Sequence, residues 1–221
     1  MNITEYLIKV QRDGLVIDTV YDVGANKGFW SPTIKQSALP ASHFYMFEGN
    51  TANEPALKAS GIPYYIGILS NPGRDYVEFY DSATTGDSYY KENTAHYDGK
   101  TPTRYPARTL DSIIEECELP VPNFLKIDTQ GSEIDVLKGT EQVLGQVDLV
   151  YLECPIICYN LGAPTIQDYL DYMRTQGFIP TDILEVHRSE ETLLQVDIMF
   201  INMTTKERLY GTNQWSRPLT N

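Results

Sequence analysis

The chain has 221 residues, of which 42% are hydrophobic and 21% are charged, and its formal net charge is −13. These values are typical of a globular protein, and the excess of acid argues against nucleic-acid binding, which depends on clustered Lys and Arg. No stretch is long and apolar enough to cross a membrane, no secretion signal is evident, and three cysteines cannot all pair. The sequence therefore predicts a soluble protein of a reducing compartment, the cytoplasm, and leaves its oligomeric state open.

The first part of the chain is dominated by an apolar stretch that leads into a turn with two glycines. Residues 1–15 are expected to form a short lead-in helix, and the run from Val16 to Asp22, rich in Val, Ile, Thr and Tyr, predicts a buried strand that stops at this acid. Gly24 and Gly28 follow, and residues 29–39 predict a helix. Because glycine has no Cβ, such a turn lets backbone N–H groups approach a ligand closely. A tight turn without a ligand is the alternative.

Alternating elements continue up to a long polar segment. The predicted elements are strands over residues 43–48, 62–69 and 76–80 and a helix over residues 51–60. Residues 81–108 show no periodicity and are too long for a plain connection. This segment is rich in tyrosine, which disordered segments usually lack. An ordered functional loop is therefore expected rather than a disordered excursion.

Regular alternation resumes in the second half of the chain. The predicted elements are helices over residues 110–117, 132–138 and 165–176 and strands over residues 123–128, 147–153, 178–186 and 193–202. Residues 203–221 are expected to form a C-terminal tail. Strands that alternate with helices indicate an α/β fold, in which a mainly parallel sheet is covered by helices on both faces. No repeat or second domain is evident, so residues 1–221 are expected to form one domain.

Four of the predicted strands end on an acidic residue, namely Asp22, Glu48, Asp128 and Glu153. The carboxyl ends of parallel strands meet along one edge of the sheet, which is where open α/β proteins bind ligands. An acidic edge suits a cation or a ligand with many hydroxyls. Glu48 lies 26 residues after Asp22, where a carboxylate accepts hydrogen bonds from the hydroxyls of a ribose. A solvated loop acid is the alternative for Glu48.

The spacing of the glycines separates two classes of nucleotide ligand. A nicotinamide-binding domain needs G-x-G-x-x-G, so that a pyrophosphate lies against the helix. This chain has G-x-x-x-G, and Asp22 just before it repels a diphosphate but attracts the ammonium group of an amino acid. The expected ligand thus has a ribose, a cationic amino-acid tail and no phosphate, as S-adenosylmethionine does. A nucleotide-cofactor oxidoreductase and a non-catalytic module that binds S-adenosylmethionine are the alternatives.

Four motifs then carry a resemblance to a known family. They are Asp22-Val-Gly-Ala-Asn-Lys-Gly28, Phe47-Glu48, Thr109-Leu-Asp111, and Phe124-Leu-Lys-Ile-Asp-Thr-Gln-Gly-Ser-Glu133 through Val136-Leu-Lys-Gly139. Together they resemble the FkbM family of S-adenosylmethionine-dependent methyltransferases over roughly residues 16–202. The resemblance implies a Rossmann-like sheet of about seven strands, mostly parallel with the last antiparallel, and O-methylation, often of a sugar hydroxyl in glycan or natural-product assembly.

Two positions depart from the pattern of the family. Gly49 stands where the family usually has proline, and Gln130 stands where it usually has an acid. The first change loosens a turn without removing the ribose contact, and no role is assigned to position 130.

The resemblance also implies the residues that bind the cofactor. They are Asp22, Gly24, Ala25, Asn26 and Gly28 in the first turn, Glu48 at the ribose, Ile68, Leu69 and Ser70 around the adenine, and Trp30 and Ser31 at the methionine end. Trp30 is equally consistent with a position in the core.

Transfer of a methyl group from a sulfonium is a direct displacement, which alignment, exclusion of water and a general base accelerate. Asp128 is the first candidate for the base, because its strand end adjoins the cofactor strand. A role only in cofactor binding is the alternative for Asp128. His96 and His187 are the alternative bases.

The acceptor, a small molecule or a glycan, is expected to contact residues 86–94. The proposed contacts are Ser88, Tyr89, Lys91 and Asn93, together with Glu153 at a neighbouring strand end. Tyrosine offers a flat apolar face and a hydroxyl, which suits a sugar, and a purely structural flap is the alternative. Asp128 and Glu153 are also suited to a divalent cation, but the sequence supplies no clear third ligand, so no metal is expected.

Overall fold

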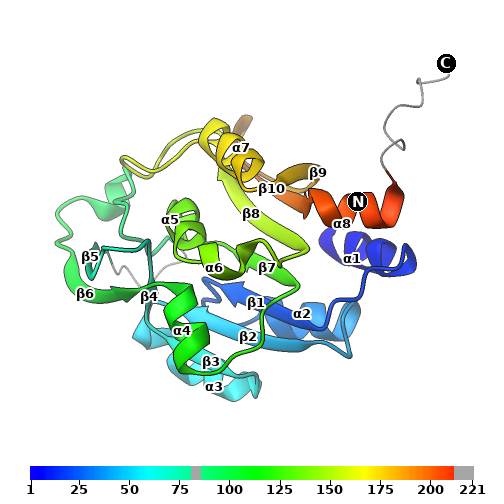
Figure 1. Ribbon diagram of the computed structural model, residues 1–221. Helices are drawn as coiled ribbons and strands as arrows, with labels where there is room; N and C mark the ends of the chain where they lie inside the picture. The colour runs from blue at the N-terminus through cyan, green and yellow to red at the C-terminus, as the bar shows by residue number, and fades with distance from the viewer. Residues whose placement is uncertain (81–85, 212–221) are drawn as a thin grey trace.

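A seven-stranded sheet organises the computed structural model, which describes residues 1–80 and 86–211 apart from the side chain of His96 (Figure 1). Its strands are β1 (Thr19–Val23), β2 (His43–Glu48), β3 (Tyr64–Ile66), β7 (Phe124–Ile127), β8 (Leu149–Pro155), β9 (Phe178–Ser189) and β10 (Thr192–Asn202). They lie in the order β3-β2-β1-β7-β8-β10-β9. Strands β3, β2, β1, β7 and β8 pair in parallel, and β10 is antiparallel to both of its neighbours. The predicted α/β fold with an antiparallel last strand is confirmed.

Strand β1 lies inside this sheet, between β2 and β7, and all of its residues are buried. A strand covered on both faces has no polar face, which explains why its sequence reads as a continuous β-rich run. From β1 the chain builds outward through β2 and β3, and it later crosses back to add β7 and β8 on the other side. The strand order therefore reverses between β1 and β7. At such a point the carboxyl ends of the strands leave a crevice for a ligand.

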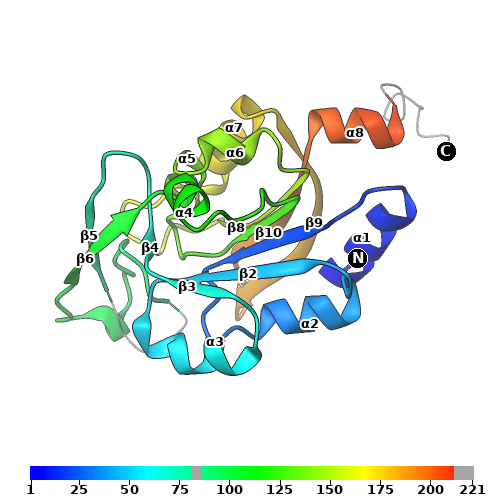
Figure 2. The same ribbon diagram turned by 60° about the horizontal axis from the view of Figure 1, so that its bottom comes forward.

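Helices cover both faces of the sheet (Figure 2). They are α1 (Ile3–Arg12), α2 (Trp30–Ser37), α3 (Glu54–Ser60), α4 (Leu110–Glu116), α5 (Glu133–Lys138), α6 (Glu141–Leu144), α7 (Ile166–Thr175) and α8 (Met203–Tyr210), with a short 3-10 turn, η1 (Thr51–Asn53), before α3. Helices α1, α2 and α8 share one apolar cluster with Val20, while α4, α5, α6 and α7 share another with Tyr21. Because consecutive strand residues point to opposite faces, these two clusters lie on opposite sides of β1.

A second, three-stranded sheet corrects two expectations from the sequence. Residues 62–69, predicted as one strand, divide into β3 and β4 (Ile68–Leu69), because the chain leaves the main sheet between them. Strand β4 pairs with β6 (Thr103–Arg108), which also pairs with β5 (Tyr76–Phe79). The sequence places residues 103–108 in the functional loop, and this expectation is wrong because they form β6. Three of its six residues are exposed and only one is buried, so it carries no apolar pattern.

The end of the described chain corrects a third expectation. Residues 203–210 were predicted as the start of a tail, but they form helix α8. Asn202 caps this helix, since its side-chain oxygen accepts a hydrogen bond from the backbone N–H of Thr204 at 3.0 Å. Arg208 holds it to the sheet through an ion pair of 3.1 Å with Asp148. The rest of the predicted tail, residues 212–221, lies outside the described residues.

None of the helices in residues 1–80 and 86–211 has the length and apolar character needed to cross a membrane.

Candidate active site

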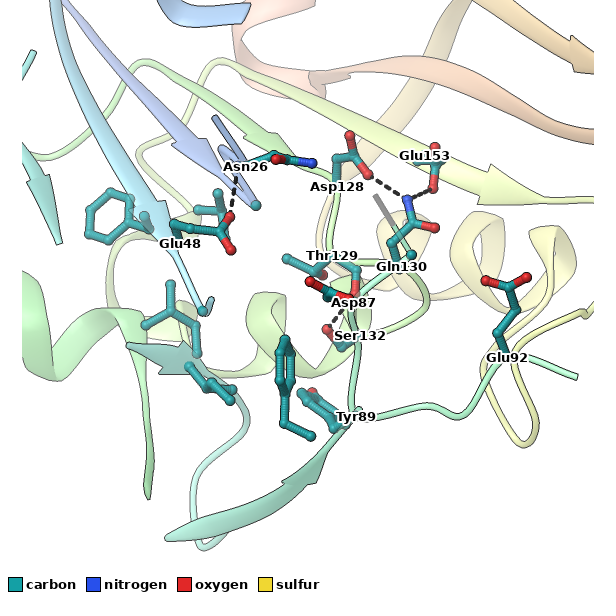
Figure 3. A pocket seen from close by; sticks show the side chains of 18 of the residues that line it. Asn26, Glu48, Asp87, Tyr89, Glu92, Asp128, Thr129, Gln130, Ser132 and Glu153 are labelled. Atoms are coloured by element: carbon teal, nitrogen blue, oxygen red, sulfur yellow. Dashed lines mark hydrogen bonds between the residues drawn. The ribbon is translucent and has the colours of Figure 1, made fainter. Parts of the chain in front are cut away.

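A cavity of about 640 Å³ lies at the carboxyl ends of β1, β2 and β7 (Figure 3). Gly24, Asn26 and Glu48 line it beside the first turn, and Asp128 lines it at the end of β7. The structure therefore brings residues from three separate predicted motifs into one cavity, at the edge where the strand order reverses.

The first turn needs its glycines for reasons other than those predicted. Gly24 has φ +75°, and a Cβ there would lie 1.8 Å from the carbonyl oxygen of Asp128. Gly28 has φ +71°, and its Cβ would lie 2.9 Å from a methyl carbon of Leu57. The first missing side chain admits the neighbouring strand end, and the second admits Leu57 of α3. Gly28 itself is not part of the lining of this cavity.

Glu48 is held rigidly at the end of β2. Its carboxylate accepts hydrogen bonds of 2.7 Å from the backbone N–H groups of Asn26 and Asn50, and a weaker one of 3.4 Å from the side chain of Asn53. Only 8% of Glu48 is exposed, and burial raises the pKa of its carboxyl group above the usual value, although these hydrogen bonds oppose the shift. A carboxylate offers about four acceptor positions, so capacity is left for a ligand in the cavity.

Asp22 does not reach the cavity, which contradicts the expected contact with an ammonium group of the ligand. It is fully buried, and its two carboxylate oxygens lie 2.9 Å from Nζ of Lys126 and 2.7 Å from the Oγ of Ser31, which donates a hydrogen bond. Ser31 is equally buried and is likewise absent from the lining. The ammonium group of Lys126 thus occupies the position beside Asp22 that was expected for the ligand.

Lys126 lies beside the expected cofactor residues, although no expectation from the sequence includes it. It is buried in the middle of β7, where its Nζ also donates a hydrogen bond of 3.2 Å to the carbonyl of Gly24 and lies 3.5 Å from the carboxylate of Asp128. Burial alone would lower the pKa of Lys126, but Asp22 and Asp128 raise it, so it stays charged. The sequence signal that indicates its role is a lysine inside an otherwise apolar strand, because a buried lysine needs a charged partner.

Two of the three residues expected around the adenine lie on the apolar side of the cavity. Ile68 and Leu69 line it, as expected, and Phe47 and Phe79 add two aromatic walls that were not predicted. Ser70 is fully buried outside the lining, and its hydroxyl lies 3.3 Å from that of Tyr89.

Gln130 joins the two acidic strand ends that flank the cavity. Its side-chain amide donates hydrogen bonds of 3.0 Å to Asp128 and 2.8 Å to Glu153 (Figure 3). Its backbone is in the left-handed region at φ +56°, and its carbonyl accepts a bond of 2.5 Å from the side chain of Asn160. Burial, and then the charge of Asp128, raise the pKa of Glu153 well above its usual value. An amide is the side chain that relieves this repulsion, which gives the departure from the family pattern a physical reason.

The predicted acceptor loop reaches the cavity only in part. Of the proposed acceptor contacts, Tyr89 on the loop and Glu153 on β8 line it, whereas Ser88, Lys91 and Asn93 do not. Ser88 is buried in a β-bridge with Tyr80. The backbone of residues 91 and 93 is bonded to residues 161 and 159, so this part of the loop packs on the segment after β8. The side chain of His96 lies outside the described residues.

A second cavity of about 690 Å³ adjoins the first at the end of β7. Asp128, Glu153 and His187 line both, so these three side chains lie where the two cavities meet. The aromatic rings of Phe29 and Trp30 line the second cavity, and Phe29 is 74% exposed. Trp30 also packs edge-on against Phe124, with ring centroids 6.0 Å apart, so it serves the core and the cavity together. Ala25 lines the second cavity but not the first.

Comparison with solved structures identifies the class of fold. An FkbM methyltransferase from Methylobacillus flagellatus KT superposes with a TM-score of 0.50 at 17% identity, covering 86% of this chain and 46% of that one. Magnesium protoporphyrin IX methyltransferase (ChlM) from Synechocystis PCC 6803, solved with bound S-adenosylmethionine, superposes with a TM-score of 0.50 at 10% identity, covering 90% and 76% of the two chains. The fold is that of the class I methyltransferases. The chain spans less than half the length of the first of these structures.

Comparison of sequences identifies the family. Residues 22–180 match the methyltransferase FkbM domain, and the chain belongs to this family of methyltransferases. It is also 24% identical, over 184 residues, to the hexuronic acid methyltransferase AglP of Haloferax volcanii, a match that covers 80% of this chain and 70% of that protein. The resemblance read from the four sequence motifs is confirmed. A dinucleotide-dependent oxidoreductase, one of the alternatives, finds no support in this match.

Proposed function

We propose that this chain transfers the methyl group of S-adenosylmethionine to a hydroxyl group of a sugar. The observation that supports this cofactor is the position of Glu48, a buried carboxylate at the end of β2 that lines the first cavity. Glu48 can still accept a hydrogen bond from a ligand in addition to those from the protein backbone. One ribose hydroxyl would take the remaining position, and a second would replace the weak 3.4 Å bond from the side chain of Asn53. Ile68, Leu69 and Phe79 would enclose the adenine, because they supply apolar walls beside the same cavity.

The acceptor is assigned to the second cavity. It meets the first at Asp128, so a hydroxyl placed there lies next to the reactive end of the cofactor. The rings of Phe29 and Trp30 offer flat apolar surfaces, which suit the face of a sugar ring. The relative named a hexuronic acid methyltransferase supports a sugar as the class of acceptor.

Asp128 is the proposed general base. When bound, S-adenosylmethionine supplies a methyl group on a positively charged sulfur, and the acceptor oxygen displaces that sulfur directly. Asp128 would accept the proton that the hydroxyl loses, since its side chain is 37% exposed and borders both cavities. Lys126, 3.5 Å away, and the amide of Gln130 hold its carboxylate in place.

Calorimetric titration tests the cofactor. S-adenosylhomocysteine should bind the chain, and NAD should not. Glu48→Gln should weaken binding about tenfold, because it removes a charge-assisted hydrogen bond worth roughly 1.5 kcal/mol. Glu54→Gln, which changes an exposed acid at the start of α3, is the matched control. Binding of NAD alone would refute the proposal.

Transfer itself is tested with S-adenosylmethionine carrying an isotopically labelled methyl group and a panel of glycosides that differ in acidic and neutral sugars. The product should carry the label as an ether on a sugar oxygen. Asp128→Asn should keep S-adenosylhomocysteine binding and lower turnover at least a hundredfold, the usual contribution of about 10² from general-base catalysis. Binding without turnover on every glycoside would instead identify a non-catalytic module or a different acceptor class.

A further inference from the structure

Three potential metal ligands meet at the border of the second cavity, one from each of three neighbouring strands. They are Glu153 on β8, His187 on β9 and Asp197 on β10. Asp197 pairs directly with Glu153 across β8 and β10, while His187 pairs with Gln195, two residues before Asp197, across β9 and β10. A step of two residues along a strand keeps the same face. One ligand atom from each side chain lies within 4.8 Å of the other two.

Two of these ligand atoms lie close together without forming a hydrogen bond. Nε2 of His187 and Oδ1 of Asp197 lie 3.2 Å apart, and both are inaccessible to solvent. Neither atom makes a hydrogen bond with any of the described residues, and the contact between the two atoms is not a hydrogen bond either. Buried polar atoms nearly always have a partner. A cation between them would supply it.

Neighbouring side chains hold the carboxylates in a fixed orientation. The hydroxyl of Tyr151 donates a hydrogen bond of 3.0 Å to the second oxygen of Asp197. The amides of Gln130 and Gln195 donate to the two oxygens of Glu153. Partners of this kind orient the ligands in metal sites and are part of their affinity.

The charge of the second cavity also favours a cation. Four acids line it, Asp128, Glu153, Glu185 and Asp197, against two lysines, Lys27 and Lys126. An acceptor that carries a carboxylate would be repelled by this excess. A divalent ion would balance it.

The geometry points to a site for one divalent transition-metal ion, bound by Glu153, His187 and Asp197. One imidazole nitrogen with two carboxylate oxygens suits ions that accept mixed ligands, such as Mn²⁺ or Zn²⁺, better than Mg²⁺, which prefers oxygen alone. All three side chains line the second cavity. If the proposed function holds, the oxygens of the acceptor would complete the coordination of the ion, so the ion would select acceptors with a carboxylate or neighbouring hydroxyls. In that case His187 is a ligand rather than a base.

Electron paramagnetic resonance of Mn²⁺, titrated into the full chain after treatment with a chelator, tests the site. One equivalent of Mn²⁺ should bind per chain. His187→Gln and Asp197→Asn should each weaken binding at least about tenfold. Asp182→Asn makes the same charge change on β9, outside the lining of either cavity, and should bind as the parent does. The bound signal should show coupling to an imidazole nitrogen, and His187→Gln should abolish that coupling.

Two outcomes would overturn the site. One is the absence of stoichiometric binding, and the other is equal affinity in the parent and in both ligand variants; either would leave an ordinary ion pair between His187 and Asp197. Binding of S-adenosylhomocysteine, measured on the same samples, shows that each variant is folded. It also separates the two proposals: Mn²⁺ binding without S-adenosylhomocysteine binding refutes the proposed function and keeps the metal site, and the reverse refutes only the metal site.

Discussion

Replacing Lys126 with methionine should destabilise the protein severely, although it removes only one charged group. Methionine keeps much of the volume of lysine but leaves Asp22, 2.9 Å away and fully buried, without its cation. An unpaired buried charge costs about 3–5 kcal/mol, which is a large part of the stability of a typical domain. At roughly 2–4 °C per kcal/mol for a chain of this size, the midpoint of thermal unfolding should fall by about 6–20 °C.

A double variant isolates the cause of this loss. Adding Asp22→Asn to Lys126→Met removes the stranded charge and should recover most of the stability, because replacing both partners of a buried ion pair by neutral groups is often close to neutral. Lys138→Met, on the exposed side of α5, should change little. The assay is denaturant unfolding followed by circular dichroism. A loss below about 1 kcal/mol in the single variant, or a double variant no more stable than the single, would refute the account of Lys126 as the partner of Asp22.

Three other predictions follow from the same region. Gly24→Ala should not fold at 25 °C, because its Cβ would lie 1.8 Å from the carbonyl oxygen of Asp128. Gly61→Ala, at φ +72° with open space around it, should lower the free energy of unfolding by only about 1–2 kcal/mol. Expression and circular dichroism compare the two variants. Gln130→Glu exchanges a donor for a third carboxylate and should lower the free energy of unfolding by about 1–3 kcal/mol, measured by denaturant unfolding. An unchanged stability would contradict the bridging role of Gln130. Burial raises the pKa of Glu48, so its carboxylate should be protonated at a higher pH than an exposed glutamate. The affinity for S-adenosylhomocysteine should therefore begin to fall at that higher pH on acidification. This decline should be absent in Glu48→Gln.

Local sequence patterns predicted the parts of the fold that local physics controls. The β-rich run before Gly24 and the apolar run over residues 43–48 gave β1 and β2, because strands buried on both faces have no polar face. The alternation of strands and helices predicted a parallel sheet, and the strand ends predicted the edge where the cavities lie. The position of Glu48 in that lining follows from its place at the end of β2.

Patterns of this kind could not predict partners far apart in the chain. Asp22 and Lys126 lie side by side because β1 and β7 are neighbours in register, which pairs these two residues directly. Their charges cancel inside the protein, so the acid that seemed to await a cationic ligand is already satisfied. The split of residues 62–69 and the strand in residues 103–108 depend likewise on a second sheet with little apolar signal.

The sequence by itself determined most strands of the main sheet, the helices that alternate with them, and the end of the sheet that carries the acidic residues, because these properties depend on neighbouring side chains in the chain. Only the tertiary structure decided which of those acids are exposed to a cavity and which are neutralised. It also brought His187 beside Asp197, since the antiparallel pairing of β9 with β10 joins residues that no periodicity relates. Electrostatic partners are chosen by distance through space, and that distance exists only once the strands have paired.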